Sequence, residues 1–137
     1  MGDVTARLEG LAERLRVVAG AENVITDPAE LRTYECDGLT YHRATPGVVV
    51  LPDGAEQIAE IVRACTAEGV PYIARGSGTG LSGGALPRTD GVLIVTSRMR
   101  RILEIDIDDE RAVVEPGVIN LDVSKAVRPG GYYYAPD

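Results

Sequence analysis

The stretch that decides the fold of this chain is Arg75-Gly76-Ser77-Gly78-Thr79-Gly80-Leu81-Ser82-Gly83-Gly84-Ala85, which follows the apolar, β-prone run Val70-Pro71-Tyr72-Ile73-Ala74. Five of the nine residues from 76 to 84 are glycine. Glycine lowers the cost of positive φ and removes side chains, so successive backbone N–H groups can converge on an anion. The hydroxyls of Ser77 and Thr79 and the guanidinium of Arg75 add donors that suit phosphate oxygens. We interpret the stretch as a pyrophosphate cradle, and the alternative is a flexible surface loop.

Two familiar phosphate motifs match this loop only in part. Gly78, Gly80 and Gly83 satisfy G-x-G-x-x-G, but a dinucleotide fold needs a helix that begins inside the motif. The turn-rich segment 86–91 follows instead. The Walker A spacing fails as well, because Gly84 stands in the place of the lysine and Ala85 in the place of the hydroxyl. The loop is therefore expected to close between two strands without a crossover helix.

Composition limits the classes of function. With 137 residues, of which 45% are hydrophobic, the chain is long enough for one globular domain with a core. A formal net charge of −7 argues against a nucleic-acid-binding surface. The spacing of Cys36 and Cys65 does not match a metal site, and the sequence shows no signal peptide. Both observations favour reduced thiols in a cytoplasmic protein. No apolar stretch approaches the about 20 residues of a membrane span, so any membrane contact is expected to be peripheral.

The first forty residues are expected to be mainly helical. Apolar residues three or four apart predict an amphipathic helix from Val4 to Ala19. Asp27 before Pro28 predicts the cap of a second, short helix that reaches about Tyr34. The polar connector that follows, residues 35–43, holds the only histidine, His42, which we interpret as a solvated side chain rather than a ligand.

A βαβ unit precedes the glycine loop. The apolar run 48–51 predicts a strand covered on both faces. Asp53 is then expected to cap a helix that begins near Ala55 and ends at Gly69, and residues 71–74 form the second strand. Strands joined by one helix are parallel, so the loop should leave the carboxyl end of the second strand, where ligands bind in open α/β sheets.

After the loop, the apolar run 91–95 predicts a third buried strand. The cationic segment 96–101 is interpreted as a solvated connector rather than a phosphate site. Alternating residues 102–107 and the run 112–118 predict an antiparallel hairpin. The four carboxylates between Asp106 and Glu110 lack the glycine and terminal glutamate of a calcium loop, which favours an exposed acidic turn.

The last segment is expected to be a helix followed by an aromatic run. Asn120 predicts the N-cap of a helix that ends before Pro129-Gly130-Gly131. Three consecutive tyrosines, 132–134, would normally be buried by the chain that comes next, so the sequence is expected to be cut short. The predicted fold class is α+β, with N-terminal helices, a small parallel βαβ subdomain and the start of an antiparallel α+β subdomain.

Several of these segments, taken in order, resemble one known domain. They are the glycine stretch with its strand (71–85), the first strand (48–52), part of the helix that follows it (58–62), the turn 114–118 and the final segment 132–137. Together they resemble the FAD-binding domain shared by vanillyl-alcohol oxidase and p-cresol methylhydroxylase, here called the PCMH type. Within that superfamily the chain is most similar to the FAD-binding subunit of glycolate oxidase and to D-lactate dehydrogenases. The resemblance begins at about residue 30 and implies a helical lead-in over residues 1–40 and an incomplete PCMH-type domain over residues 41–137.

The resemblance implies a set of cofactor-binding residues and no catalytic or metal-binding residue within this chain. Pro52 would border the FAD, and Pro116 and Gly117 would approach it from the second subdomain. Thr79 stands where some relatives carry a histidine that binds flavin covalently, so the FAD would be held noncovalently. The pyrophosphate would be wrapped by Ala74, Arg75, Gly76, Ser77, Gly78, Thr79, Gly80 and Leu81.

The implied activity is the oxidation of a small 2-hydroxy acid of the glycolate or D-lactate type. Substrate-binding parts would lie beyond this chain, so the chain is expected to be the inactive N-terminal portion of a flavin-dependent oxidoreductase. The complete enzyme would act with iron–sulfur or other electron-transfer subunits, in the cytoplasm or at the inner face of a membrane. The alternative is a noncatalytic module that binds a nucleotide or another anion, or that assembles with a partner or with itself through unpaired strand edges.

Overall fold

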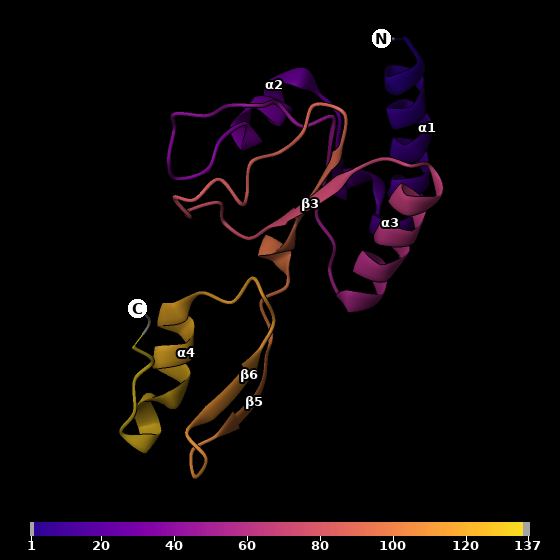
Figure 1. Cartoon of the computed structure of the whole chain (residues 1–137). Helices are drawn as coiled ribbons and strands as arrows, with labels where there is room; N and C mark the ends of the chain where they lie inside the picture. Colours follow the sequence, from indigo (N-terminus) through magenta and orange to yellow (C-terminus); the bar gives the residue numbers. More distant parts are fainter. Residues whose placement is uncertain (1, 136–137) are drawn as a thin grey trace. The chain divides into compact units, whose positions relative to one another are not determined.

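The computed structural model describes residues 2–135, which form helices and strands in two compact units that divide between residues 96 and 97 (Figure 1). The first unit contains the mixed sheet and the glycine loop, and the second contains a hairpin and a helix. Each unit is described separately below. The division at residues 40 and 41 that the resemblance implies stays a prediction.

The first unit opens with helix α1, Gly2–Ala19, as the apolar spacing predicts. Its buried face is formed by Leu8, Leu11, Ala12 and Leu15. A short 3-10 helix, Ala21–Asn23, leads into strand β1, Val24–Ile25, which the sequence did not predict. Asp27 then accepts hydrogen bonds from the backbone N–H groups of Ala29 and Glu30 and caps α2, Pro28–Leu31, which continues as the 3-10 helix Arg32–Tyr34. This second helix and its cap confirm the sequence prediction.

Four strands form the sheet of the first unit, in the order β1-β2-β4-β3. Strands β2 (Val48–Val50), β3 (Tyr72–Arg75) and β4 (Val92–Val95) are parallel, and β1 pairs with β2 in the antiparallel sense. The predicted parallel strands are therefore present, but β4 is inserted between the two strands of the predicted βαβ unit. The two central strands β2 and β4 are buried along their whole length, whereas β3 lies at an edge.

Helix α3, Ala55–Ala67, connects β2 to β3. The prediction that Asp53 caps this helix is wrong, because Gly54 occupies the cap position and makes no side-chain cap hydrogen bond. The Asp53 backbone N–H instead donates to Gln57 Oε1 at 2.8 Å, and the helix begins at Ala55 as expected. Gly69 follows the helix at a φ of +61°, which confirms the predicted end.

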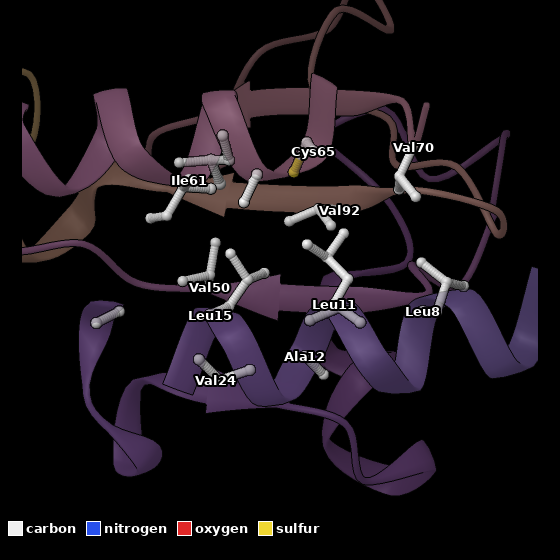
Figure 2. Close-up of a cluster of buried hydrophobic side chains, with 14 residues drawn as sticks. Leu8, Leu11, Ala12, Leu15, Val24, Val50, Ile61, Cys65, Val70 and Val92 are labelled. Atoms are coloured by element: carbon white, nitrogen blue, oxygen red, sulfur yellow. The ribbon is translucent and has the colours of Figure 1, made fainter. Parts of the chain in front are cut away.

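The main core of the first unit lies between the two long helices and one face of the sheet. Figure 2 shows Leu11 and Leu15 of α1 and Ile61 of α3 pointing into the same cluster as Val50 and Val92. A second, smaller cluster covers the opposite face of the sheet and contains Leu31, Val49, Leu93 and Val95. The sheet is thus a rigid layer packed on both faces, and it fixes the position of the loop that leaves β3.

The second unit follows the 3-10 helix Thr96–Arg98 and begins with β5, Ile102–Asp106, and β6, Arg111–Val114. These strands form the predicted antiparallel hairpin. Helix α4, Asn120–Val127, and the 3-10 helix Arg128–Gly130 complete the unit. The predicted cap at Asn120 is wrong by one residue, because Ile119 holds the extended cap conformation and Asn120 is the first helical residue.

Candidate functional site

The glycine loop connects two neighbouring parallel strands. Strand β3 ends at Arg75, β4 begins at Val92, and no helix forms over the residues between them. This result confirms that the loop lacks the crossover helix of a dinucleotide-binding fold. The loop leaves the carboxyl edge of β3, on the side of the sheet where ligands of open α/β sheets bind.

The backbone of the loop offers a run of donors. Over the described residues 2–135, no protein acceptor receives a hydrogen bond from the backbone N–H groups of residues 76–82. Of these residues, Gly76 and Gly78 are half-buried and the other five are exposed, so the segment lies at the surface. Buried backbone donors are almost always paired in proteins, and a run of accessible unpaired ones is a surface suited to an anion.

Gly78 allows the loop to fold close to Arg75. Its φ is +72°, and a Cβ placed on it would lie 1.8 Å from Arg75 Nη2. The positive φ would strain any residue other than glycine, and a Cβ here would require the Arg75 side chain to move. The density of glycine noted in the sequence therefore has a specific structural cause at residue 78.

Arg75, predicted to offer its guanidinium to phosphate, makes its observed contacts with the protein. Its Nη1 donates to the carbonyl oxygens of Tyr34 and Cys36, both at 3.0 Å. The guanidinium carbon also lies 5.9 Å from the centre of the Tyr34 ring. These contacts attach the start of the loop to the segment that follows α2.

Two residues that the sequence analysis left in a polar connector hold the loop further along. The carboxylate of Asp37 accepts from the backbone N–H groups of Leu39 at 2.9 Å and of Gly83 at 3.0 Å. The Gly38 N–H donates to the carbonyl oxygen of Gly80 at 3.0 Å. The dipeptide Asp37-Gly38 is a turn signal, and it was the only indication of this role in the sequence.

Pro52 and Ala74, both predicted to contact the cofactor, lie at or just beyond the same edge of the sheet. Val50 in β2 and Ala74 in β3 pair with the same residue of β4, Ile94. Because the strands are parallel, the residues after Val50 and after Ala74 emerge at the same carboxyl edge. The buried Pro52 and the first glycine of the loop, Gly76, are each two residues beyond that common level.

In the second unit, Pro116 and Gly117 form the turn after β6, and hydrogen bonds hold its base. The Glu115 side chain, 7% exposed, accepts from the Arg101 guanidinium at 2.6 Å and from the Arg101 backbone N–H at 2.8 Å. These hydrogen bonds lower the pKa of Glu115 below its ordinary value. The Gly117 N–H donates to the Met99 carbonyl oxygen at 2.8 Å, which closes the turn.

Other residues weighed as candidates in the sequence are exposed or hydrogen-bonded within the protein. His42 is exposed, and Arg100 and Arg101 donate to Ser97 and Glu115. Among residues 2–135, no three histidine, cysteine, aspartate or glutamate side chains are grouped so that they could hold a metal ion. Within the same residues, no helix combines the length and apolar character needed to cross a bilayer.

A family comparison identifies the domain. A model of the FAD binding domain matches residues 46–137, which include the glycine loop and the second unit. This chain belongs to the FAD binding domain family. The glycolate oxidase subunit GlcD of Escherichia coli is 49% identical over 98% of this chain, and GlcD of Bacillus subtilis is 38% identical over 91% of it. This chain spans 26% and 27% of the length of these curated relatives.

Solved structures show the same fold. The 4-ethylphenol oxidase of Gulosibacter chungangensis superimposes with a TM-score of 0.82 and 31% identity, over 92% of this chain and 25% of that one. p-Cresol methylhydroxylase superimposes with a TM-score of 0.80 and 23% identity, over the same shares of the two chains. The predicted α+β, PCMH-type FAD-binding fold is confirmed. Pro136 and Asp137, which carry part of the sequence resemblance, lie outside the described residues.

FAD is the cofactor of the family, and the loop fits its diphosphate. A diphosphate needs several donors within a short distance, little steric bulk and room to enter. Residues 76–82 supply unpaired N–H groups, and a Cβ on Gly76 or Gly80 would meet nothing within 4 Å. The loop therefore combines free donors with open space.

Proposed function

We propose that residues 74–81 bind the pyrophosphate of FAD, and that the run of unpaired N–H groups over residues 76–82 supplies the contacts. A flavin nucleotide carries its negative charge on the diphosphate, so backbone N–H groups can hold it without a lysine. The hydroxyls of Ser77 and Thr79 add two donors to this run. In this proposal Arg75 contributes by attaching the start of the loop to the Tyr34 and Cys36 carbonyl oxygens.

We propose that Pro52, Pro116 and Gly117 complete this chain's share of the flavin site. The position of Pro52 at the same sheet edge as the loop supports its part. The turn at Pro116 and Gly117 is held by the buried Glu115 and by the bond from Gly117 to Met99, which gives it a fixed shape. For both turn residues the proposal rests on the resemblance.

The FAD is proposed to be held noncovalently. Thr79 offers no imidazole for a flavin linkage, and the one histidine of the chain, His42, lies in a different segment. A denaturant should therefore release any bound flavin completely into solution.

The complete protein is proposed to oxidise a small 2-hydroxy acid of the glycolate or D-lactate type, with electron-transfer subunits as partners. When bound, FAD supplies the hydride acceptor for this class of reaction. No residue of this chain is proposed to act in catalysis, and its contribution is to bind and orient the cofactor. The 49% identity to a glycolate oxidase subunit supports the substrate class.

Two flavins test the binding proposal directly. FAD carries the diphosphate and riboflavin lacks it, so titration of this chain with each should show binding of FAD and much weaker binding of riboflavin. Affinity for FAD is expected to be weaker than micromolar, because a partial site leaves the cost of immobilising a large ligand uncompensated. Equal affinities for the two flavins would contradict a pyrophosphate site. Turnover of glycolate or D-lactate with added FAD and an electron acceptor would contradict the expected inactivity.

An assembly role is the second candidate, and exposed apolar side chains of the second unit favour it. Leu103 is 58% exposed, Leu121 57% and Tyr133 77%. The hairpin has only two strands, which leaves edges able to pair with another chain. Sedimentation analysis beside the flavin titration separates the two: a monomer that binds FAD tightly would contradict the assembly role.

We also propose that the protein is cytoplasmic, as the cysteine usage predicts. Cys36 and Cys65 are both free thiols, and Cys65 is buried. Free thiols are usual in a reducing compartment. Fractionation of cells that produce the complete protein tests this proposal, and recovery from an oxidising compartment would contradict it.

A further inference from the structure

We propose that residues 34–39, here called the clasp, set the shape of the glycine loop before a ligand arrives, with Asp37 and Gly38 as positioning residues. This inference rests on the proposed function, since it concerns how the same loop is made ready for an anion. The clasp lies about forty residues earlier in the sequence. It begins at the last residue of the 3-10 helix Arg32–Tyr34 and continues into the connector to β2, which Figure 1 shows running beside the loop.

Asp37 is the centre of the clasp. Asp37 is buried, with 6% of its surface exposed. Its two carboxylate oxygens accept hydrogen bonds from different partners. Oδ1 accepts from Leu39 N and shapes the clasp itself, whereas Oδ2 accepts from Gly83 N in the loop. A carboxylate offers acceptors on both oxygens, but an asparagine amide would place an N–H₂ group against one of these donors. The site therefore requires an aspartate rather than any polar residue of that size.

Gly38 is required for a steric reason. A Cβ on Gly38 would lie 2.6 Å from the carbonyl oxygen of Thr79 and 3.1 Å from that of Gly80. The same close approach allows the Gly38 N–H to bond the Gly80 carbonyl at 3.0 Å. Any side chain at residue 38 would displace the part of the loop that the proposed function assigns to the pyrophosphate.

Arg75 forms the third attachment. Its two bonds to the carbonyl oxygens of Tyr34 and Cys36 join the end of β3 to the start of the clasp. The loop is thus held at its beginning through Arg75, at Gly80 through Gly38 and at Gly83 through Asp37. The residues between these points are those whose N–H groups remain unpaired.

These three attachments explain how a loop rich in glycine, and therefore flexible by itself, can form a binding site. Ordering a residue costs backbone entropy, and glycine loses the most, so an unrestrained loop would lose affinity when it orders on the ligand. Hydrogen bonds within the protein order the loop during folding, so its N–H donors are already in position when a ligand binds. The bond from Gly83 to Asp37 also occupies that N–H, which sets the boundary of the donor run at residue 82.

The test separates positioning from general stability. Asp37→Asn is compared with Asp27→Ala, which removes the cap of α2 and destabilises the same unit without touching the loop. Inorganic pyrophosphate is titrated into each isotope-labelled chain and followed by the amide signals of residues 76–82. We expect Asp37→Asn to weaken binding by about tenfold or more and to accelerate amide exchange in the loop, and Asp27→Ala to leave both unchanged at matched stability.

Gly38→Ala is the second variant, and it keeps the Asp37 carboxylate. It should produce the same loss of affinity, and it decides the question if Asp37→Asn fails to fold. If a folded Asp37→Asn or Gly38→Ala chain keeps its affinity for pyrophosphate and its rate of amide exchange in the loop, the proposed role of the clasp is wrong. Failure of the unsubstituted chain to bind pyrophosphate would instead contradict the proposed function. The role of the clasp would then still be tested by amide exchange in the loop of the variants, measured without ligand.

Discussion

The carboxylate of Asp37 accepts a hydrogen bond from the backbone N–H of Gly83 at 3.0 Å, across 46 positions of sequence. This contact joins the connector after α2 to the far end of the glycine loop. It makes residues 34–39 part of the candidate site, although none of them was predicted to be. The loop is consequently a braced segment of the first unit, with the unpaired N–H groups between its points of attachment.

Removing a large side chain from the main core should destabilise the first unit. Leu15→Ala deletes a fully buried side chain between α1 and the sheet, and we expect a loss of about 2–5 kcal/mol in the free energy of unfolding. Val17 on the same helix is 87% exposed, so Val17→Ala should change it by less than about 0.5 kcal/mol. Urea unfolding followed by circular dichroism checks both. Equal effects would mean that α1 does not pack as described.

A side chain at Gly78 should distort the loop. Gly78→Ala forces an alanine to a φ of +72° and places its Cβ 1.8 Å from Arg75 Nη2. We expect a loss of about 1–3 kcal/mol in unfolding free energy together with shifted amide signals at residues 34–39, because Arg75 must release its carbonyl partners. Gly84→Ala is the matched control, since a Cβ there meets nothing within 4 Å. A tolerated Gly78→Ala beside a damaging Gly84→Ala would contradict the loop geometry.

The sequence predicted most elements because their signals are local. Three- and four-residue spacing specified α1, continuous apolar runs specified β2 and β4, and alternation specified the hairpin. Strand β1 escaped prediction because its two residues are too short to show a period. The helix caps at Asp53 and Asn120 were each misplaced by one residue, since several polar or small residues near a helix start can satisfy the same preference.

The candidate site was predicted only in part, for a physical reason. Glycine density is visible in the sequence and indicated where the loop lies. The partners that shape the loop lie about forty residues away, and pairing across such a distance leaves no periodic signal. The same limit applies to the insertion of β4 between β2 and β3, because strand order depends on packing of the whole sheet.

The second unit should lose stability in acid through Glu115. Hydrogen bonds from the Arg101 side chain and backbone lower the pKa of Glu115, so the ionised form stabilises the folded state. That contribution is complete above the unfolded-state pKa of about 4.3 and is lost as the pH falls through the lower pKa of the folded state. Glu115→Gln should lack this acid-dependent loss, whereas Glu104→Gln on β5 of the same unit should retain it. Amide signals of Arg101 and Gly117, followed from neutral to acid pH, measure the difference, and an identical acid response in both variants would contradict it.

The two thiols should differ in reactivity. Burial, partly offset by a backbone hydrogen bond, raises the pKa of Cys65 to about 11, and the residue is fully buried, whereas Cys36 is half-buried. The thiolate is the reactive form, so at about pH 8 a thiol reagent should label only Cys36 in the folded chain and both residues in denaturant. Cys36→Ser should abolish labelling of the folded chain. Rapid labelling of Cys65 in that variant would show that the core between α3 and the sheet opens readily.

The most direct test of the central claim is a titration of the isotope-labelled chain with FAD, in which every backbone amide signal is followed. Binding of the diphosphate to the loop predicts that the largest shifts fall on residues 76–82, that inorganic pyrophosphate reproduces them and that riboflavin does not. Shifts concentrated outside the loop, or shifts from riboflavin equal to those from FAD, would contradict the claim.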